Sequence, residues 1–297
     1  MDHLQINVVV LNYNGLANTL ECLRSLKGQK LSKGKINIVV VDNASVDGSA
    51  QALGKVEGIH LIINSSNLGY SGGNNIGIKY SVQNGADLIF ILNNDTIVDD
   101  KCLEVLSEAA KSSDIISPKI YFAKNYEFHK GRYQEKEIGK VIWYAGGKID
   151  WDNIIGIHIG VDEVDRNQFN KRQKIDLATG AAMLVKRKVF ERIGFFDEKY
   201  FLYLEDMDFC VRAKKANFNI AFEPKAIVWH KNAASAGSGS KFQDYYFTRN
   251  RLLFATKYAR VRTKLALLRQ VLSQISNPIK RKAFLDFLTC KFGYGKI

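Results

Sequence analysis

The sequence predicts an α/β fold with an open, mostly parallel sheet. In its first 120 residues, short apolar and β-branched runs alternate with amphipathic helical segments. Continuous apolar runs are typical of parallel strands, because helices cover both faces of such a sheet. The composition indicates a globular chain, since 46% of the 297 residues are hydrophobic and 25% are charged. A disordered, collagen-like or coiled-coil protein is thereby excluded.

Five strands and four helices are expected in this first part of the chain. The strands are expected at Ile6–Leu11, Ile36–Val41, Ile59–Ile63, Leu88–Leu92 and Ile115–Ser117. The helices are expected at Ala17–Leu26, Ser49–Leu53, Asn74–Gln83 and Lys101–Lys111. Repeated strand–helix units predict neighbouring strands that run in the same direction.

After about Tyr121 the pattern changes to antiparallel-looking strands and long loops with glycine pairs. A helix is expected near Leu204–Lys215, and a strand that ends at His230 precedes a small-residue loop at 233–240. We therefore divide the chain into three parts: residues 1–120, 121–240 and 241–297.

Neither a membrane-crossing segment nor a disulfide framework is expected. The first apolar run is too short for a signal peptide, and no stretch approaches the roughly 18 apolar residues of a membrane span. The cysteines are widely spaced, which predicts reduced core thiols and a cytoplasmic protein. They are Cys22, Cys102, Cys210 and Cys290.

Polar residues directly follow four of the predicted strands. They are Asn12-Tyr13-Asn14-Gly15, Asp42-Asn43-Ala44-Ser45, the stretch 67–75, and Asn93-Asn94-Asp95-Thr96. A single polar strand end would be a helix cap, but ligands bind beyond the carboxyl ends of parallel strands, so four together predict a binding crevice. A dinucleotide fingerprint is excluded, because the first strand-to-helix turn holds one glycine, Gly15. P-loop and nucleophile-elbow motifs are also absent from the sequence.

Three groups of candidate residues carry chemistry. Asp42 suits a hydrogen bond to a base or ribose, or caps the next helix. Asp95 and His230, at two strand ends, suit a divalent cation shared with phosphate oxygens; a turn cap would explain Asp95 alone. Glu205, Asp206 and Asp208 follow an apolar stretch, which raises proton affinity as a general base requires. The alternative for these acids is a first helical turn favoured by the helix dipole.

The positive charge is concentrated in the tail. The net charge is +13, and residues 249–297 hold twelve Lys or Arg and one acid, Asp286. A helical stripe of apolar residues is expected there: Phe254, Tyr258, Val261, Leu265, Leu268, Leu272 and Ile275. We weigh a helix packed on the core or a homodimer seam equally with a basic amphipathic surface that rests on anionic lipid. Nucleic-acid binding is the least favoured interpretation, because no recognition motif accompanies the charge.

As a set, the motifs resemble those of a family 2 glycosyltransferase with the GT-A fold, in the subgroup that includes bacterial rhamnosyltransferases. Besides the four polar strand ends, they are Thr179-Gly180-Ala181, Gly194-Phe195-Phe196-Asp197, Glu205-Asp206-Met207-Asp208, Trp229-His230 and Arg249-Asn250. The resemblance implies a Rossmann-like, nucleotide-sugar-binding half at 1–120 and a smaller, mixed-strand acceptor half at 121–240. Residues 241–297 would then be basic amphipathic helices.

The resemblance also assigns roles. Asp206 matches the general base, and Glu205 supports the position of the acceptor. Asp95 matches the metal-binding end of a D-x-D motif whose first position is Asn93, and His230 would be a second ligand for Mg²⁺ or Mn²⁺. The acceptor residues would be Thr179, Gly180, Ala181 and Asp208. The donor nucleotide would contact Asn12, Asn14, Asp42, Asn43, Asn67, Gly73, Asn74, Asn94 and Arg249, the last of these facing the diphosphate.

The expected function is inverting, metal-dependent transfer of a sugar from a nucleoside-diphosphate sugar to a hydroxyl of a glycan or lipid-linked acceptor in bacterial surface polysaccharide synthesis. Rhamnose from dTDP-rhamnose is the favoured donor, and a UDP-hexose is the alternative. A non-catalytic nucleotide-sugar-binding component of an assembly complex is a further alternative. A peripheral location on the inner face of the plasma membrane is one interpretation of the tail.

Overall fold

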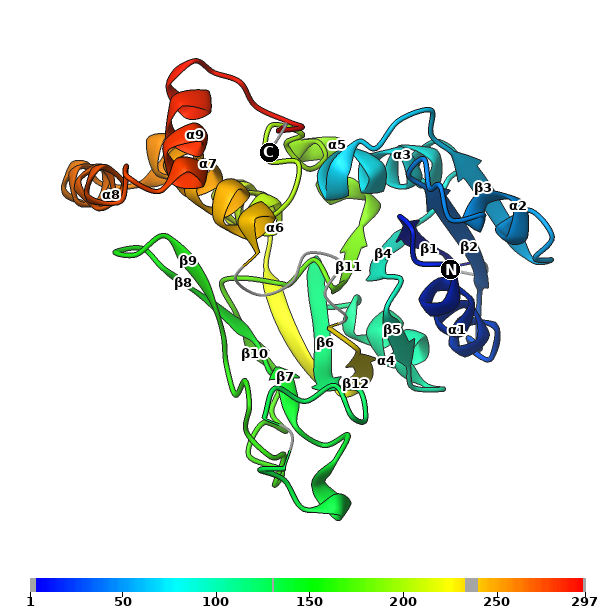
Figure 1. The fold of residues 1–297 in the computed structure, drawn as a ribbon. Helices are drawn as coiled ribbons and strands as arrows, with labels where there is room; N and C mark the ends of the chain where they lie inside the picture. The colour runs from blue at the N-terminus through cyan, green and yellow to red at the C-terminus, as the bar shows by residue number, and fades with distance from the viewer. Residues whose placement is uncertain (1–3, 130, 233–239, 296–297) are drawn as a thin grey trace.

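The computed structural model describes residues 4–129, 131–232 and 240–295, which form a mixed α/β fold around one large sheet (Figure 1). The small-residue stretch 233–239 lies outside the described residues. The first part contains β1 (Gln5–Asn12), α1 (Leu16–Lys27), β2 (Lys35–Asp42), α2 (Ser49–Leu53), β3 (Ile59–Ile63), α3 (Gly69–Gln83), β4 (Leu88–Asn93), β5 (Thr96–Val98), α4 (Cys102–Ala109) and β6 (Ile115–Phe122). All nine predicted elements of this part are confirmed; β5 was missed, α3 begins five residues early, and β6 ends five residues late.

The second part of the chain adds short strands, several of them antiparallel, and two helices. The elements are β7 (Ile142–Tyr144), β8 (Gly147–Asp150), β9 (Ile155–His158), β10 (Gln173–Lys174), β11 (Ala182–Lys186), α5 (Arg187–Ile193), α6 (Glu205–Lys215) and β12 (Ile220–His230). The helix expected near Leu204–Lys215 is α6. A 3₁₀ turn at Glu135–Glu137 precedes β7.

The main sheet runs in the order β10-β12-β6-β11-β4-β1-β2-β3. Strands β3, β2, β1 and β4 are parallel, whereas β11 is antiparallel to both of its neighbours, β4 and β6. β5 pairs with the carboxyl end of β12 and places His230 opposite Thr96. This pairing brings the end of β12 to the end of β4, although about half the chain separates them in sequence.

Helix α3 explains the glycines after β3. A Cβ on Gly73 would lie 2.5 Å from Leu11, and one on Gly77 would lie 2.5 Å from Val9. The glycines therefore let α3 approach β1 closely. On the opposite face of β1, Thr19 of α1 donates a hydrogen bond to Asn12, so helices cover both faces. Gly73 lies in the second turn of α3, and its packing on β1 accounts for a glycine at this position; its predicted contact with the donor stays a prediction.

The tail forms three helices, α7 (Lys241–Tyr258), α8 (Val261–Ser273) and α9 (Pro278–Leu288), that pack on one another. The predicted apolar stripe on one helix is wrong. Ala259 and Arg260 are extended, with ψ of 153° and 154°, and they separate α7 from α8. Neither proline nor glycine marks this break in the sequence. Val261, Leu265 and Leu272 are exposed, whereas Phe254 is buried.

Among the described helices, none combines the length and the apolar character needed to span a bilayer.

Candidate active site

The carboxyl ends of β1, β2 and β4 are linked by polar side chains. Asn12 donates a 2.7 Å hydrogen bond to Asp42, and the amide oxygen of Asn12 accepts from Thr19 and, at 3.4 Å, from Asn94. The second carboxylate oxygen of Asp42 accepts from the backbone N–H of Ser45. Asp42 and Asn12 are fully buried. The ends of these three strands are therefore linked by hydrogen bonds, and Asp42 has partners at both oxygens.

Asparagines also hold the surrounding loops. Asn43 donates to Asn67 at 2.9 Å and accepts from Asn64 at 3.0 Å. Asn14 accepts from the backbone N–H of Val46 at 2.8 Å. Asn74 donates to the carbonyl of Tyr70, and its buried amide oxygen has no hydrogen-bond partner among the described residues. These side chains connect the loops that follow the strands; their contact with a donor stays a prediction.

Asp95 and His230 meet as the sequence predicts. The Nε2 atom of His230 lies 3.0 Å from Oδ1 of Asp95, and the two side chains are 6% and 15% exposed. The edge of the imidazole ring contacts Trp143 at a centroid distance of 4.6 Å. The buried Nδ1 of His230 has no hydrogen-bond partner among the described residues.

This pair fits a divalent cation. Two adjacent ligands on an octahedral Mg²⁺, at about 2.1 Å each, are themselves about 3.0 Å apart, which is the separation of Nε2 and Oδ1. Within the described residues no group of three or more His, Cys, Asp or Glu side chains is placed to hold a metal. Diphosphate oxygens and water would therefore have to supply the other ligands, as is usual for Mg²⁺ and Mn²⁺.

Asp206 lies in the first turn of α6, after a strained segment. Phe201, Tyr203 and Leu204 all have positive φ, between 62° and 70°. This turn aims the Asp206 carboxylate at the backbone N–H of Gly180, 3.1 Å away, and the other oxygen accepts from Met207 at 2.8 Å. Asp206 keeps partial exposure.

Burial raises the pKa of the Asp206 carboxyl above its ordinary value, and raises the pKa of Glu205 well above its own. The charge of Asp206 adds to the shift of Glu205, whose buried Oε2 has no hydrogen-bond partner among the described residues. Two neighbouring buried carboxyls cannot both ionise readily, so Glu205 is the weaker acid of the two and Asp206 loses its proton first.

Tyr70, which belongs to the polar stretch 67–75 and for which the sequence predicted no role, connects α3 to the turn at Gly180. Its hydroxyl donates a 2.5 Å hydrogen bond to the carbonyl of Gly180, whose N–H binds Asp206. Burial raises the pKa of Tyr70, and the charges of Glu205, Asp206 and Asp95 raise it further. The buried Thr179 and Ala181 flank the same turn.

Asp208 is not positioned for an acceptor, which corrects the prediction. Its side chain is fully buried and forms ion pairs with Arg212 at 2.7 Å and Lys257 at 2.8 Å. It also accepts a hydrogen bond from Tyr258. Burial raises the pKa of Asp208, but these two cations outweigh burial and hold the pKa below its ordinary value. Asp208 joins α6 to α7.

Arg249 is likewise a structural residue, so the prediction that it faces the diphosphate is wrong. Its guanidinium is fully buried and donates to the carbonyls of Lys199, Tyr200 and Gly293 at 2.8–3.2 Å. The guanidinium also stacks on the ring of Tyr246, 4.9 Å from its centroid. Its hydrogen-bonding capacity is used within the fold.

Arg249→Ala is therefore expected to lower the free energy of unfolding by at least about 3 kcal/mol, because the variant loses the hydrogen bonds of a fully buried guanidinium to three carbonyls and its packing on Tyr246. Urea denaturation measures this loss, with the exposed Arg260→Ala as the control. An unchanged unfolding midpoint together with lost donor binding would return Arg249 to the donor site.

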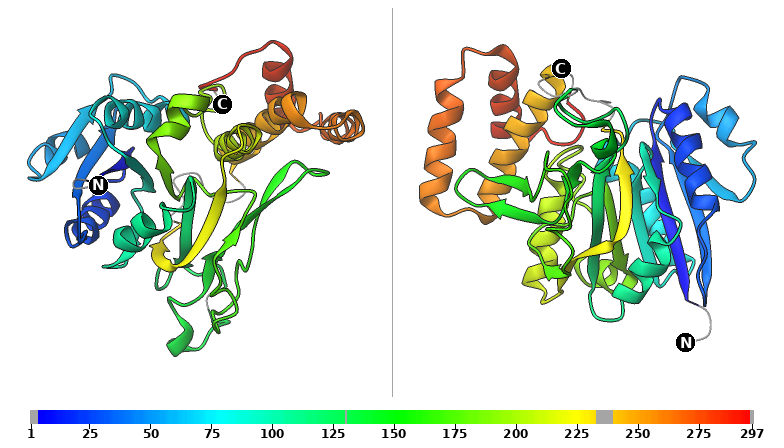
Figure 2. Two further views of the ribbon diagram at one scale, coloured as in Figure 1. Left: turned by 180° about the vertical axis from the view of Figure 1, so that it is seen from behind. Right: turned by 90° about the horizontal axis from the view of Figure 1, so that it is seen from below.

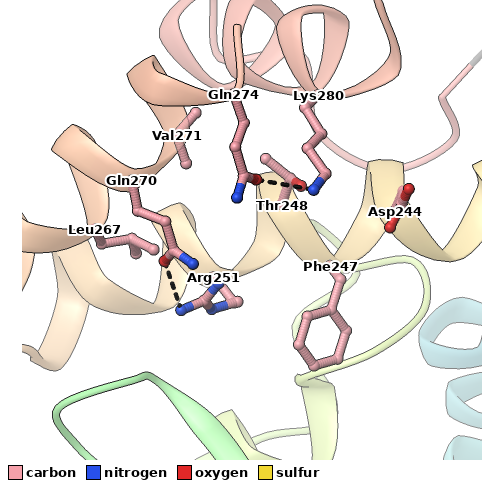
Figure 3. Close-up of a pocket in the computed structure, with 9 residues that line it drawn as sticks. All are labelled: Asp244, Phe247, Thr248, Arg251, Leu267, Gln270, Val271, Gln274 and Lys280. Atoms are coloured by element: carbon pink, nitrogen blue, oxygen red, sulfur yellow. Dashed lines mark hydrogen bonds between the residues drawn. The ribbon is translucent and has the colours of Figure 1, made fainter. Parts of the chain in front are cut away.

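Two cavities lie away from these residues. One of about 150 Å³ lies between α7, α8 and α9, where Arg251 binds Gln270 and Lys280 binds Gln274 (Figure 3). The other, of about 590 Å³, lies at the amino ends of β1 and β2, beside His60 and Tyr80. Neither cavity is lined by Asp95, Asp206 or His230.

Comparisons with known proteins show the family and the fold of the chain. Residues 7–194 match the family described as Glycosyl transferase family 2. The low-salt glycan biosynthesis hexosyltransferase Agl10 of Haloferax volcanii is 27% identical, over 84% of this chain and 74% of that protein. The dTDP-rhamnosyl transferase RfbF of Shigella flexneri is 25% identical, over 85% of this chain and 80% of that protein. The crystal structure of GalNAc-T7 with UDP, GalNAc and Mn²⁺ aligns with a TM-score of 0.60 at 15% identity, over 84% of this chain and half of that one.

Proposed function

Because the chain belongs to glycosyl transferase family 2, we propose that it transfers a sugar, with inversion, from a nucleoside-diphosphate sugar to an acceptor hydroxyl. The enzyme is a glycosyltransferase, and its fold is the GT-A fold. The observation that carries the proposal is the pairing of β4 with β11. The N–H of Asn93 donates to the carbonyl of Ala181 at 2.9 Å, which brings Gly180, the partner of Asp206, beside the strand end where Asp95 meets His230.

Asp206 is the proposed general base. The acceptor oxygen forms a bond to the anomeric carbon and gives its proton to the Asp206 carboxylate. The bond between the anomeric carbon and the diphosphate oxygen breaks, and its electron pair leaves with the diphosphate. The N–H groups of Gly180 and Met207 fix the direction of the carboxylate, and burial raises its affinity for the proton.

Asp95 and His230 are the residues proposed to hold Mg²⁺ or Mn²⁺, and a bound cation would neutralise the negative charge that develops on the diphosphate. The amide side chains at the ends of β1, β2 and β4 are proposed to position the nucleotide. Among these, Asn12, Asn43 and Asn94 already constrain one another or their neighbours by hydrogen bonds.

The proposed donor is dTDP-rhamnose, which the name of RfbF supports, and a UDP-hexose is the alternative. The proposed acceptor is a hydroxyl of a glycan or a lipid-linked saccharide in surface polysaccharide synthesis.

A panel of nucleoside-diphosphate sugars tests this proposal by thermal shift and by release of free nucleoside diphosphate, each with and without Mn²⁺. At about 100 times its dissociation constant, dTDP-rhamnose is expected to raise the melting temperature by about 5 °C in the presence of Mn²⁺. Product sugars should have the opposite anomeric configuration to the donor. Retention would overturn the inverting mechanism, and binding without transfer to any acceptor would favour a non-catalytic component.

A further inference from the structure

The outward face of α8 combines exposed apolar and basic side chains. Val261, Leu265 and Leu272 are 72%, 52% and 47% exposed. Arg262 and Arg269 are exposed beside them, at positions three or four residues from the leucines, so they share one face of the helix. The opposite face of α8 packs inward through Thr263, Leu267 and Val271. Figures 1 and 2 show α8 at the outer edge of the molecule, farther from the sheet than α7.

Helix α9 repeats this combination. Arg281, Leu285 and Leu288 follow one another at spacings of four and three residues, and all are exposed. Leu285 and Leu288 are 51% and 57% exposed, and Tyr294 beyond the helix is 62% exposed. Large exposed apolar side chains are thus concentrated on these two helices and the segment that follows them.

Helices α8 and α9, both described in full, contribute one carboxylate against their positive charge. The one acid between 249 and 297 is Asp286, and its side chain is 12% exposed. It binds Lys282 at 3.0 Å and the hydroxyl of Tyr245 at 2.7 Å, so its charge is directed inward. The outward residues of α8 and α9 therefore present positive charge and apolar side chains together.

We propose that this tail surface, formed by α8 and α9 and defined by Val261, Arg262, Leu265, Arg269, Leu272, Arg281, Leu285 and Leu288, docks on an anionic lipid bilayer. The headgroup layer of such a bilayer offers negative charge to the arginines, and the acyl boundary beneath it accepts the leucines and the valine. A second copy of the chain would bring the same positive charge face to face, which is repulsive. A nucleic acid would satisfy the arginines but leave the apolar side chains in water.

Docking through this surface would leave the candidate active site free. Asp206, Asp95 and His230 belong to α6 and to the β4–β12 edge, and they are not part of the tail surface. Lys257 of α7 binds Asp208 in the first turn of α6, and Arg249 of α7 binds the carbonyl of Tyr200 shortly before α6. The tail is therefore fixed relative to the start of α6, which is the edge of the site proposed to receive the acceptor. A docked enzyme would therefore present that edge in a defined orientation to lipid-linked molecules.

Vesicle co-sedimentation of the full chain tests the proposal without using activity. Vesicles of phosphatidylcholine alone are compared with vesicles that contain phosphatidylglycerol as well. Binding is expected to be at least tenfold stronger to the anionic vesicles and to weaken as salt is added. Equal binding to both vesicle types would overturn the proposal.

Two double variants and a matched control locate the surface. Arg262→Gln with Arg269→Gln is expected to weaken binding about 30-fold, and Leu265→Ser with Leu272→Ser at least tenfold. All four side chains are exposed, so the melting temperature should not change.

The control, Lys33→Gln with Lys55→Gln, removes two exposed charges from the nucleotide-binding half and should bind like the parent. Equal losses in the control and in the arginine variant would contradict a localised surface. The chain could instead form a dimer in the absence of lipid. If the double variant Leu265→Ser with Leu272→Ser dissociates such a dimer, the surface binds a second copy of the chain and the bilayer proposal is overturned.

Discussion

Asp206→Asn is expected to lower turnover at least about 10²-fold while donor binding stays the same. An amide cannot accept the proton of the acceptor hydroxyl, so the variant loses the base. It keeps the size of the side chain and an oxygen that can accept from Gly180, so the turn before α6 should keep its shape. Initial rates and the dissociation constant of the donor, measured in parallel, separate the two effects.

The pH dependence of the rate provides a second readout of the same residue. Catalysis needs the ionised form of Asp206, and burial raises the pKa of its carboxyl above 3.8. The rate should therefore be full at higher pH and fall as the pH drops through this raised pKa. The acid limb should disappear in Asp206→Asn. Asp208→Asn is the matched control, because its ion pairs make it a stability residue, and it should keep the limb. Normal turnover in Asp206→Asn would remove this residue from the role of base.

Asp95→Asn and His230→Ala are each expected to raise the Mn²⁺ concentration needed for half-maximal activity at least about 100-fold. Each change removes one of the two protein ligands, and even the loss of a residue that only orients a ligand costs about 10- to 100-fold in metal affinity. Activity titrated with Mn²⁺, together with spin-resonance measurement of free Mn²⁺, would report the change.

His158→Gln is the matched control for the histidine. His158 packs against Trp143, as His230 does, with ring centroids 4.5 Å apart, but the described contacts of His158 do not include Asp95. Burial lowers the pKa of His158 to about 4, so it is neutral at the pH of the assay. An equal effect of His158→Gln and His230→Ala would indicate that the packing around Trp143 matters and that His230 is not a ligand.

The sequence was sufficient to predict the strand–helix alternation because buried parallel strands leave a strong local signal. It also placed Asp95 and His230 together, since both follow apolar runs that end at one edge of the sheet. The start of α3 was missed because glycines usually indicate a loop, whereas Gly73 and Gly77 here serve close packing on β1. That reason depends on a neighbour in space and has no local signature.

The errors in the tail have a related cause. The break between α7 and α8 falls at Ala259 and Arg260, which are ordinary helix residues, so periodicity alone predicts a continuous helix. The resemblance implied that Arg249 faces the diphosphate. Its structural role was not predicted, because its carbonyl partners, among them Tyr200 and Gly293, are more than 40 residues away in sequence. Tyr70 received no role because a tyrosine within a glycine-rich motif gives no sign of its contact with Gly180.

The proposed mechanism requires that Asp95 and His230 bind the cation of the donor complex on the side that faces Asp206. Anomalous diffraction from crystals grown with Mn²⁺ and a nucleoside diphosphate measures this directly. The predicted result is one strong manganese peak within bonding distance of Oδ1 of Asp95 and Nε2 of His230, with the diphosphate between the metal and the ends of β1 and β4. A nucleoside diphosphate bound elsewhere, or manganese that contacts neither residue, would contradict the account.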